Sequence, residues 1–217
     1  MNSRHSVLDR VRRALADVPA QETPEDVVVG RDYLRSHAGA DIVTQFAERV
    51  ADYQARVIRA TADRAPGAIA ALLGERGVRE LVVPVGFPGE LLPPGPWKSL
   101  VDEPPLGLAA VEAADAVITT AALGIAVTGT LVLDAGPGQG RRMLSLLPDY
   151  HLCVVRQEQI VGDVPGALAL LDPARPLTFV SGPSATSDIE LDRVEGVHGP
   201  RTLHVLIIAT APAPEQP

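Results

Sequence analysis

A chain of 217 residues with a formal net charge of −8 is long enough for one large domain, which needs no disulfide or metal to fold. The excess of acidic residues, 27 against 19 basic ones, excludes a nucleic-acid surface that depends on bulk positive charge. The single cysteine, Cys153, excludes an internal disulfide and an iron–sulfur cluster held by this chain alone, because such a cluster takes about four thiolates.

The N-terminal region has no apolar signal core, and no run of about 18 apolar residues occurs in the chain, which predicts a cytoplasmic protein without a membrane segment. A helix is predicted from Ser6 to Ala16, with arginines on one side and an apolar stripe on the other. The stripe consists of Val7, Leu8, Val11 and Leu15. Such a helix binds a membrane or a partner protein, or packs on its own domain or a neighbouring subunit; packing is favoured.

From Asp41 onward, helical and strand-like segments alternate. Apolar residues at helical spacing follow Asp41, residues 55–60 predict a strand, and residues 66–75 predict a helix with proline in its first turn. Residues 80–85 form a continuous apolar run, which is typical of a strand covered on both faces. This order predicts an α/β fold with a mostly parallel, helix-flanked sheet.

We expect an N-terminal helix and loose arm over residues 1–40, one α/β domain over residues 41–210 and a disordered tail over residues 211–217. Repeated prolines interrupt the alternation between Phe87 and Pro105, where the sequence predicts a surface loop. The loop is either a lid over a site or a plain connection, and the plain connection is favoured because nothing in the sequence indicates motion.

Two predicted strands meet at Thr128-Gly129-Thr130. The glycine permits a tight turn, a bulge or the close approach of a ligand, and the two threonine hydroxyls are candidate ligand contacts. A β-bulge lined with threonines explains the same residues without a ligand.

A glycine-rich loop follows at once and leads into a helix predicted over residues 141–147. Backbone amides at Gly136 and Gly138, the helix N-terminus and the Arg141 side chain would bind an anion there. The spacing matches neither the phosphate-binding GK[ST] pattern nor the dinucleotide-binding GxGxxG pattern, so a plain connecting loop is the alternative.

The connection from Ser181 to Leu206 is unusually rich in hydroxyls, acids and glycines, and it begins where a predicted strand ends. Open α/β sheets bind ligands at strand ends, so we predict half of a small-molecule site here. Its candidate ligand contacts are Gly182, Ser184, Thr186 and Gly199. Asp188 and Glu190 are candidate catalytic acids, although both also suit the start of a helix capped by a nearby hydroxyl.

His198 lies in a glycine-flanked segment of the same connection and is a candidate general base or hydrogen-bond donor near neutral pH. A turn histidine that bonds only to the backbone is the alternative. No histidines and carboxylates have the spacing of metal ligands, so no metal site is predicted.

Four segments of the chain carry a family resemblance: IAVTGTLVLDAGPGQGR, LLPDYHLCVV, FVSGPSATSDIE and GVHGPRTLHVLII. They resemble the LUD-domain family, and within it the lactate utilization protein C group, from about residue 40 to residue 209. The paired GPS-x-T-x-DIE and GVHGP motifs are the most specific part. An acidic or amide residue commonly precedes the TGT triplet in the family, whereas Val127 stands here, so no acid–base role is expected at that place.

The resemblance implies a fold of the NagB/ribose-phosphate isomerase (RpiA)/CoA-transferase type. It also implies participation in the oxidation of L-lactate to pyruvate, together with two partners, lactate utilization proteins A and B, that carry iron–sulfur-type cysteine motifs. The single cysteine agrees with a non-redox subunit, and no cofactor is expected on this chain.

Two other hypotheses stay open at this point. One is a stand-alone enzyme or binding protein for a phosphorylated or CoA-linked metabolite, by analogy with relatives of the same fold. The other is a scaffold with a vestigial pocket, because each motif also has a purely structural explanation.

Overall fold

The computed structural model describes residues 3–19, 21–23, 26, 30, 37–186, 194–195 and 199–209. Contacts divide the chain into two units, Met1–Leu34 and Arg35–Pro217. The tail predicted over residues 211–217 lies outside the described residues. Every helix within the described ranges is too short or too polar to cross a membrane.

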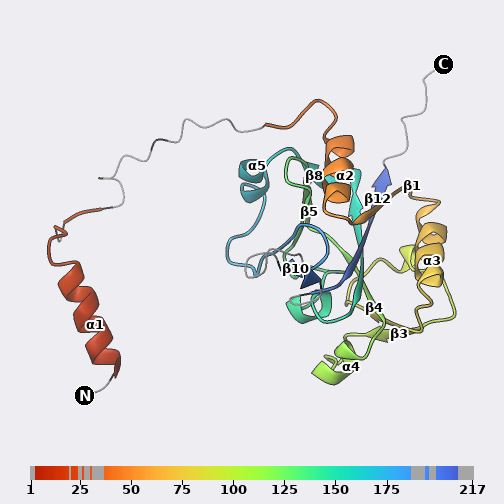
Figure 1. Cartoon of the computed structure of the whole chain (residues 1–217), viewed down its shortest axis with the longest axis horizontal. Coiled ribbons are helices and arrows are strands. Elements are labelled where there is room, and N and C mark those ends of the chain that lie inside the picture. The colour runs from red at the N-terminus through yellow and green to blue at the C-terminus, as the bar shows by residue number, and fades with distance from the viewer. Residues whose placement is uncertain are drawn as a thin grey trace. The chain divides into compact units, whose positions relative to one another are not determined.

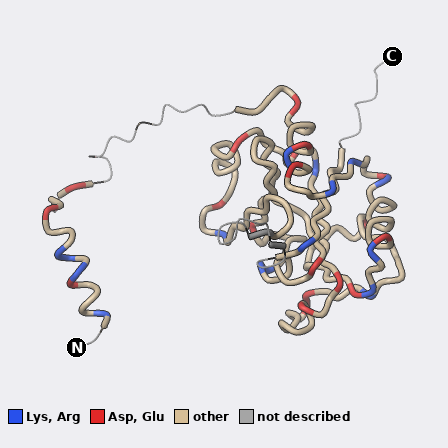
Figure 2. The backbone as a smooth tube through the Cα atoms, viewed as in Figure 1, with Lys and Arg blue, Asp and Glu red and all other residues tan. Residues whose placement is uncertain are grey.

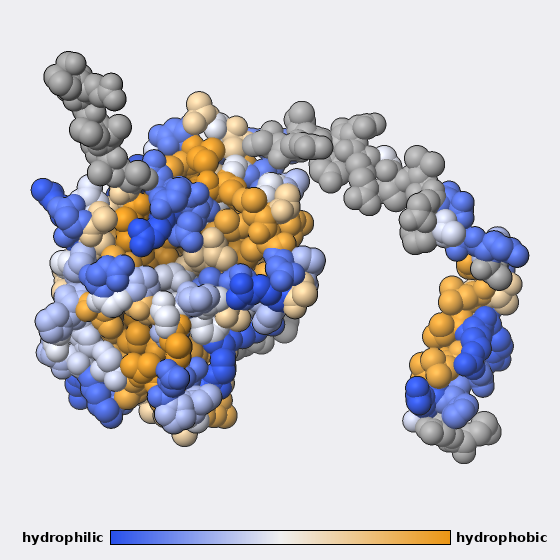
Figure 3. Space-filling view, turned by 180° about the vertical axis from the view of Figure 1, so that it is seen from behind, coloured by the Kyte–Doolittle hydropathy of each residue, from blue (hydrophilic) through white to orange (hydrophobic). Residues whose placement is uncertain are grey.

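Among the described residues of the smaller unit is the helix α1 (Ser3–Ala14). It begins before the predicted start at Ser6, so Ser6 lies inside the helix and does not cap it. None of its residues is buried, and its apolar stripe faces solvent on one side of the helix while charged residues occupy the other (Figure 3). The helix has the amphipathic pattern that the sequence predicts.

Six parallel strands form the main sheet of the larger unit, in the order β1-β12-β7-β4-β2-β3 (Figure 1). The strands are β1 (Arg56–Thr61), β2 (Glu80–Val83), β3 (Lys98–Val101), β4 (Ala116–Thr120), β7 (Tyr150–Arg156) and β12 (Thr202–Ala209). The predicted α/β fold with a mostly parallel sheet is therefore confirmed.

Alternating residues of β7 build two core layers, because successive side chains of a strand point to opposite faces of the sheet. Leu152 and Val154 pack with α3 on one face, and Cys153 and Val155 pack with α2 on the other. The two helices accordingly lie on opposite sides of the sheet (Figure 1). The helices of this unit are α2 (Ile42–Asp52), α3 (Ala65–Glu75), α4 (Leu108–Glu112) and α5 (Val164–Leu168).

A second sheet of four strands, in the order β8-β5-β6-β9, shares the core on the α2 side. Its strands are β5 (Leu123–Ile125), β6 (Thr130–Leu133), β8 (Ile160–Val161) and β9 (Thr178–Val180). The sequence predicts that the polar connection follows a strand of the open parallel sheet, and this is wrong: β9 runs antiparallel to β6 in the small sheet. The rule for carboxyl ends of parallel strands therefore does not apply to it.

Two predicted helices are also corrected. Over residues 141–147 the chain forms only a short 3-10 helix, η3 (Arg142–Ser145), because Arg141 has an extended backbone. The helix expected after a hydroxyl cap does not begin at Ser184, because the next two residues form β10 (Ala185–Thr186), which pairs antiparallel with β11 (Val194–Glu195). A start at Ser187 lies outside the described residues.

The proline-rich stretch from Phe87 to Pro105 is more than a surface loop. It contains a 3-10 helix, η2 (Gly89–Leu91), and the edge strand β3, which pairs with β2. Trp97 is buried beside them in the core on the α3 side. Sequence patterning misses β3 because this four-residue strand has three exposed positions and no apolar run.

We predict that Gly129→Ala destabilises the fold by about 2 kcal/mol, because residue 129 has a positive φ that favours glycine. Its φ is 58°, and a Cβ would lie 2.6 Å from the carbonyl carbon of Arg49 at the end of α2. Urea unfolding measures the effect.

The matched control is Gly67→Ala in α3, where a Cβ would meet nothing within 4 Å. Alanine is the better helix former, so this variant should be more stable by about 0.5 to 1 kcal/mol. If Gly129→Ala were as stable as the wild type, the close approach of this turn to α2 would be refuted.

Candidate functional site

The residues predicted for one ligand site lie in two clefts at opposite ends of the main sheet. Gly136 and Gly138 lie at the carboxyl ends of β2 and β4, beside a cleft of about 340 Å³. Gly182, Ser184 and Gly199 line a second cleft of about 310 Å³ near the amino ends of β7 and β12. The structure does not bring the two groups together, and each cleft has its own lining.

The second cleft is here named the His151 pocket. It is bounded by residues 142–146, the start of β7, residues 178–184 and residues 199–203. Its polar lining comes from Arg142, Ser145, His151, Thr178, Ser181 and Ser184. A few polar groups that converge in a partly apolar cavity are the usual make-up of a small-molecule site.

His151 is the most deeply buried polar group of the pocket, with 1% of its surface exposed. Burial lowers the pKa of its imidazole to about 4, so the ring is neutral at physiological pH. Its Nε2 lies 2.8 Å from Oγ1 of Thr119 on β4, and that hydroxyl donates to Sγ of Cys153 at 3.6 Å. If the hydroxyl hydrogen is directed to sulfur, Nε2 donates to Thr119 and Nδ1 keeps its lone pair.

No other group within the described residues bonds to the imidazole of His151, so Nδ1 has no protein partner there. A buried ring nitrogen without a partner costs free energy unless a ligand or water satisfies it. The imidazole can therefore accept a hydrogen bond from a hydroxyl that enters the pocket.

A chain of three hydroxyl groups also reaches the pocket. Oγ1 of Thr128 lies 2.7 Å from Oγ1 of Thr130, which lies 2.8 Å from Oγ of Ser181. Ser181 lines the pocket itself, whereas the two threonines stand behind it. The predicted threonines are thus linked to the site through Ser181.

Gly129 and Gly182 position this hydroxyl chain against the end of α2. Both have positive φ values, 58° and 80°, and a Cβ at Gly182 would lie 2.5 Å from Cβ of Tyr53. Only a residue without a side chain allows the two loops to pack this closely. These two predicted residues therefore shape the site from behind.

Arg142 stands at the mouth of the His151 pocket, where the pocket meets a broad groove. Within the part of the chain that the structure describes, no hydrogen-bond or ion-pair partner is found for its guanidinium. An exposed guanidinium without a competing carboxylate can bind an incoming carboxylate or phosphate in bidentate fashion.

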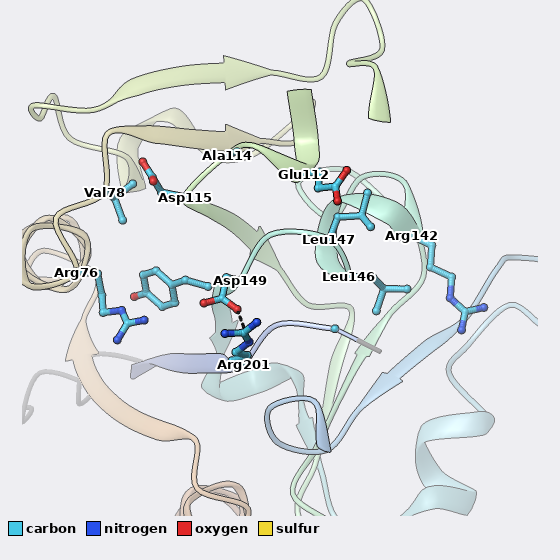
Figure 4. A pocket seen from close by; sticks show the side chains of 12 residues that line it. Arg76, Val78, Glu112, Ala114, Asp115, Arg142, Leu146, Leu147, Asp149 and Arg201 are labelled. Atoms are coloured by element: carbon cyan, nitrogen blue, oxygen red, sulfur yellow. Dashed lines mark ion pairs between the residues drawn. The ribbon is translucent and has the colours of Figure 1, made fainter. Parts of the chain in front are cut away.

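The groove has a volume of about 1040 Å³ and follows the amino ends of the central strands (Figure 4). Arg76 lies at one end and Arg142 at the other, with the Asp149–Arg201 ion pair, 3.3 Å long, between them. Basic and acidic residues are interspersed along the larger unit as a whole (Figure 2), and the groove has the same mixed charge.

Arg141, the cation that the sequence selects for the site, is engaged elsewhere. Its Nη2 and Nε donate to the carboxylate of Asp102 at 2.6 and 2.9 Å, and Nη2 also donates to Leu106 O at 3.0 Å. The hydrogen bonds from Arg141 hold the pKa of the Asp102 carboxyl below its usual value. The pair ties the glycine-rich loop to the segment after β3, and Arg142 is the arginine that faces the pocket.

The glycine-rich loop itself joins the carboxyl ends of two strands. Gly138 N–H donates to Val85 O, and Thr120 N–H donates to Gly138 O, both at 2.8 Å. Gly136 N–H donates to Oδ1 of Asp134 at 3.0 Å. Because these amides already have acceptors, a ligand at this end of the sheet must be held by side chains.

Three predicted catalytic residues, Asp188, Glu190 and His198, lie outside the described residues, and their roles stay predictions. Thr186 is described only through its backbone in β10.

Sequence reasoning missed His151, because its neighbours have the pattern of a buried strand and give no signal of a site. Within the described ranges, no three His, Cys, Asp or Glu side chains are grouped as metal ligands.

Comparison with known proteins places the chain in a family. The LUD domain profile matches residues 108–208. Lactate utilization protein C of Deinococcus radiodurans is 50% identical over 173 residues, which cover 78% of this chain and 80% of that protein. The chain belongs to the LUD-domain family.

Two further comparisons support the assignment. Lactate utilization protein C of Halalkalibacterium halodurans is 37% identical over 105 residues, or 44% of this chain and 45% of that protein. The crystal structure of a DUF162 family protein from D. radiodurans has a TM-score of 0.67 and 43% identity, and covers 81% of this chain and 99% of that one.

The segment that matches the LUD domain contains the whole polar lining of the His151 pocket. Arg76, at the far end of the groove, lies before this segment. The LUD domain therefore supplies every polar side chain that lines the pocket.

We predict that stability rises with pH between about 4 and 6.5. Burial lowers the pKa values of His151 and His204 to about 4, below the ordinary value of 6.5. In this window the unfolded chain binds more protons, so the free energy of unfolding should increase by about 1.4 kcal/mol per pH unit for each histidine.

Urea unfolding at several pH values tests this, with His151→Asn as the decisive variant. Asparagine can still bond to Thr119 but does not titrate. The increase in the free energy of unfolding per pH unit should therefore be smaller by the contribution of one histidine. An unchanged slope in this variant would contradict the neutral, buried state of His151.

Proposed function

We propose that this LUD-domain chain serves in lactate utilization as a non-redox component that binds a small 2-hydroxy or 2-oxo acid in the His151 pocket. The observation that carries the proposal is the 50% identity, over 78% of the chain, to a protein named lactate utilization protein C. The geometry of the pocket supports the ligand class.

A 2-hydroxy acid such as lactate presents a carboxylate beside a hydroxyl group. Arg142 would bind the carboxylate at the pocket mouth, where it has no partner among the described side chains. Ser181, backed by Thr130, would hydrogen-bond to the ligand, and the neutral His151 would accept from the ligand hydroxyl. The pocket of about 310 Å³ suits a ligand of this size.

Oxidation of lactate to pyruvate releases two electrons and two protons, and the electrons need an acceptor. The one cysteine of the chain is fully buried, and burial raises the pKa of its thiol to about 12, so it stays a protonated core residue. We therefore assign the electron acceptor to partner proteins with iron–sulfur clusters, the lactate utilization proteins A and B, and the binding of the acid to this chain.

One observation favours a second candidate function. The groove beside the pocket has a volume of about 1040 Å³ and is lined by three arginines, Arg76, Arg142 and Arg201, interspersed with three carboxylates. A phosphorylated or CoA-linked metabolite could place its acyl group in the pocket and its phosphates along the groove. This alternative predicts binding and turnover by the purified chain without partners.

The test is a thermal-shift screen of the purified full-length chain against lactate, pyruvate, sugar phosphates and CoA thioesters. A ligand that binds only the folded state at 100 times its Kd adds about 2.7 kcal/mol of stability, which shifts the midpoint by several degrees. Shifts with lactate or pyruvate support the first proposal, shifts with phosphate compounds alone support the second, and no shift contradicts both.

Arg142→Gln should weaken the binding of lactate and pyruvate by about tenfold or more, because it removes the charge-assisted bond to the carboxylate. Isothermal titration calorimetry measures the affinity, and growth on lactate measures the consequence in a cell that depends on this gene. The matched control is Arg64→Gln, an exposed arginine after the carboxyl end of β1 and outside the lining of the pocket, which should change neither. Equal affinities in both variants would rule out Arg142 as the carboxylate ligand.

A further inference from the structure

The cleft at the carboxyl ends of the main strands, here named the switch-point cleft, lies where the order of strands reverses. From β2 the chain passes to β3 on one side of it and then returns to β4 on the other side. Loops that leave β2 and β4 diverge at such a point, which is the usual ligand position in open α/β sheets. The cleft has a volume of about 340 Å³ and includes Gly86, Thr120 and Gln139.

Gln139 gives the cleft a buried hydrogen-bond donor. Only 6% of the residue is exposed, and its Oε1 accepts from Asp134 N–H at 2.6 Å. That bond fixes which way the amide points and turns Nε2 away from Asp134 N. Nε2 has no partner among the described residues, so a buried donor is left to be satisfied from the cleft.

Arg175 converges with this amide over Gly136. A Cβ placed on Gly136 would lie 2.8 Å from Oδ1 of Asp134, 3.1 Å from Nη2 of Arg175 and 3.2 Å from Nε2 of Gln139. The two donors and the Asp134 carboxylate therefore pack against the same face of Gly136, and only a residue without a side chain leaves room for them. The bare backbone at residue 136 thus lets the two donors lie next to each other at the cleft.

The charge of the cleft is positive. Its one carboxylate, Asp134, pairs with Nη1 of Arg175 at 3.0 Å and accepts from Gly136 N–H. Arg156 lines the same cleft and forms no ion pair with any described residue. The amide of Gln159 is engaged on both sides: its Nε2 donates to Ala121 O and Ala122 O at 2.8 and 3.2 Å, and its Oε1 accepts from Arg156 N–H at 2.8 Å.

We propose that the switch-point cleft is a second binding site, separate from the His151 pocket, for a small oxyanion such as a short-chain carboxylate. The anion accepts from Nε2 of Gln139 and from Nη2 of Arg175, beside the Asp134 carboxylate that Arg175 already pairs, and Arg156 supplies the balancing positive charge. The two sites lie at opposite ends of β7, so one chain can hold an anion in each. This inference does not depend on the proposed function.

Acetate and inorganic phosphate are suitable probes, and isothermal titration calorimetry on the full-length chain is the measurement. The titrations use the Arg142→Gln background, which removes the cation of the His151 pocket and isolates the second site. Binding in roughly the millimolar range is expected for so small a ligand. Stronger binding of acetate identifies a carboxylate site, and stronger binding of phosphate identifies an inorganic-anion site.

Gln139→Glu is the sharpest variant, because the new side chain keeps an oxygen for Asp134 N–H and replaces only the donor by a negative charge. It should weaken the binding of both probes by about tenfold or more. Arg156→Gln, on a partly exposed side chain, should weaken binding without affecting the fold, which the thermal midpoint checks. Arg64→Gln is the control and should change nothing.

The outcomes separate this proposal from the proposed function. Loss of probe binding in Gln139→Glu and Arg156→Gln, with lactate binding intact in a chain that retains Arg142, supports two independent sites. Unchanged probe binding in both variants, or no binding of either probe in the Arg142→Gln background, would overturn the second site and leave the His151 pocket untouched.

Discussion

The pairing of β7 with β4 on one side and β12 on the other is the constraint on which the rest of the structure depends. β7 is buried along almost its whole length, and its alternating side chains fill both core layers. A strand buried on both faces cannot shift its register without exchanging the two layers. The register pairs Val117 with His151 and Thr119 with Cys153, so the His151 ring reaches diagonally to the Thr119 hydroxyl at 2.8 Å. It also holds Val154 and Arg156 at the opposite end. Both candidate sites take their positions from this one strand.

The two ends of β7 offer different chemistry. At the amino end, a neutral imidazole and a chain of hydroxyl groups lie behind Arg142, an arrangement suited to an acid that also carries a hydroxyl or keto group. At the carboxyl end, the cleft holds an amide donor, two guanidinium groups and the Asp134 carboxylate around a bare glycine. Cys153, the single cysteine of the chain, lies between the two ends, and burial raises the pKa of its thiol to about 12, so it stays protonated.

The sequence predicts the fold class well, because apolar runs and helical spacing report directly on burial. It does not predict β3, whose residues are mostly exposed, or the membership of β9 in a separate antiparallel sheet, since both depend on long-range pairing. For the site, glycines and hydroxyls indicate the right loops but not which cleft each loop enters. Adjacent arginines show the limit most clearly: only the structure reveals that Arg141 is held by Asp102 while Arg142 faces the pocket. In the sequence, His151 has the pattern of a residue in a buried strand. Only the structure shows that its Nδ1 has no partner among the described residues.

The measurement that tests the account most directly is the nitrogen NMR spectrum of the histidine side chains, in protein labelled with ¹⁵N, during titration with lactate. His151 should show the pattern of a neutral ring, and its Nδ1 resonance should move as lactate binds, while His204, bonded to Tyr150 at 2.9 Å, should not respond. If lactate bound the chain and left both nitrogens of His151 unchanged, the pocket described here would not be the site of the acid.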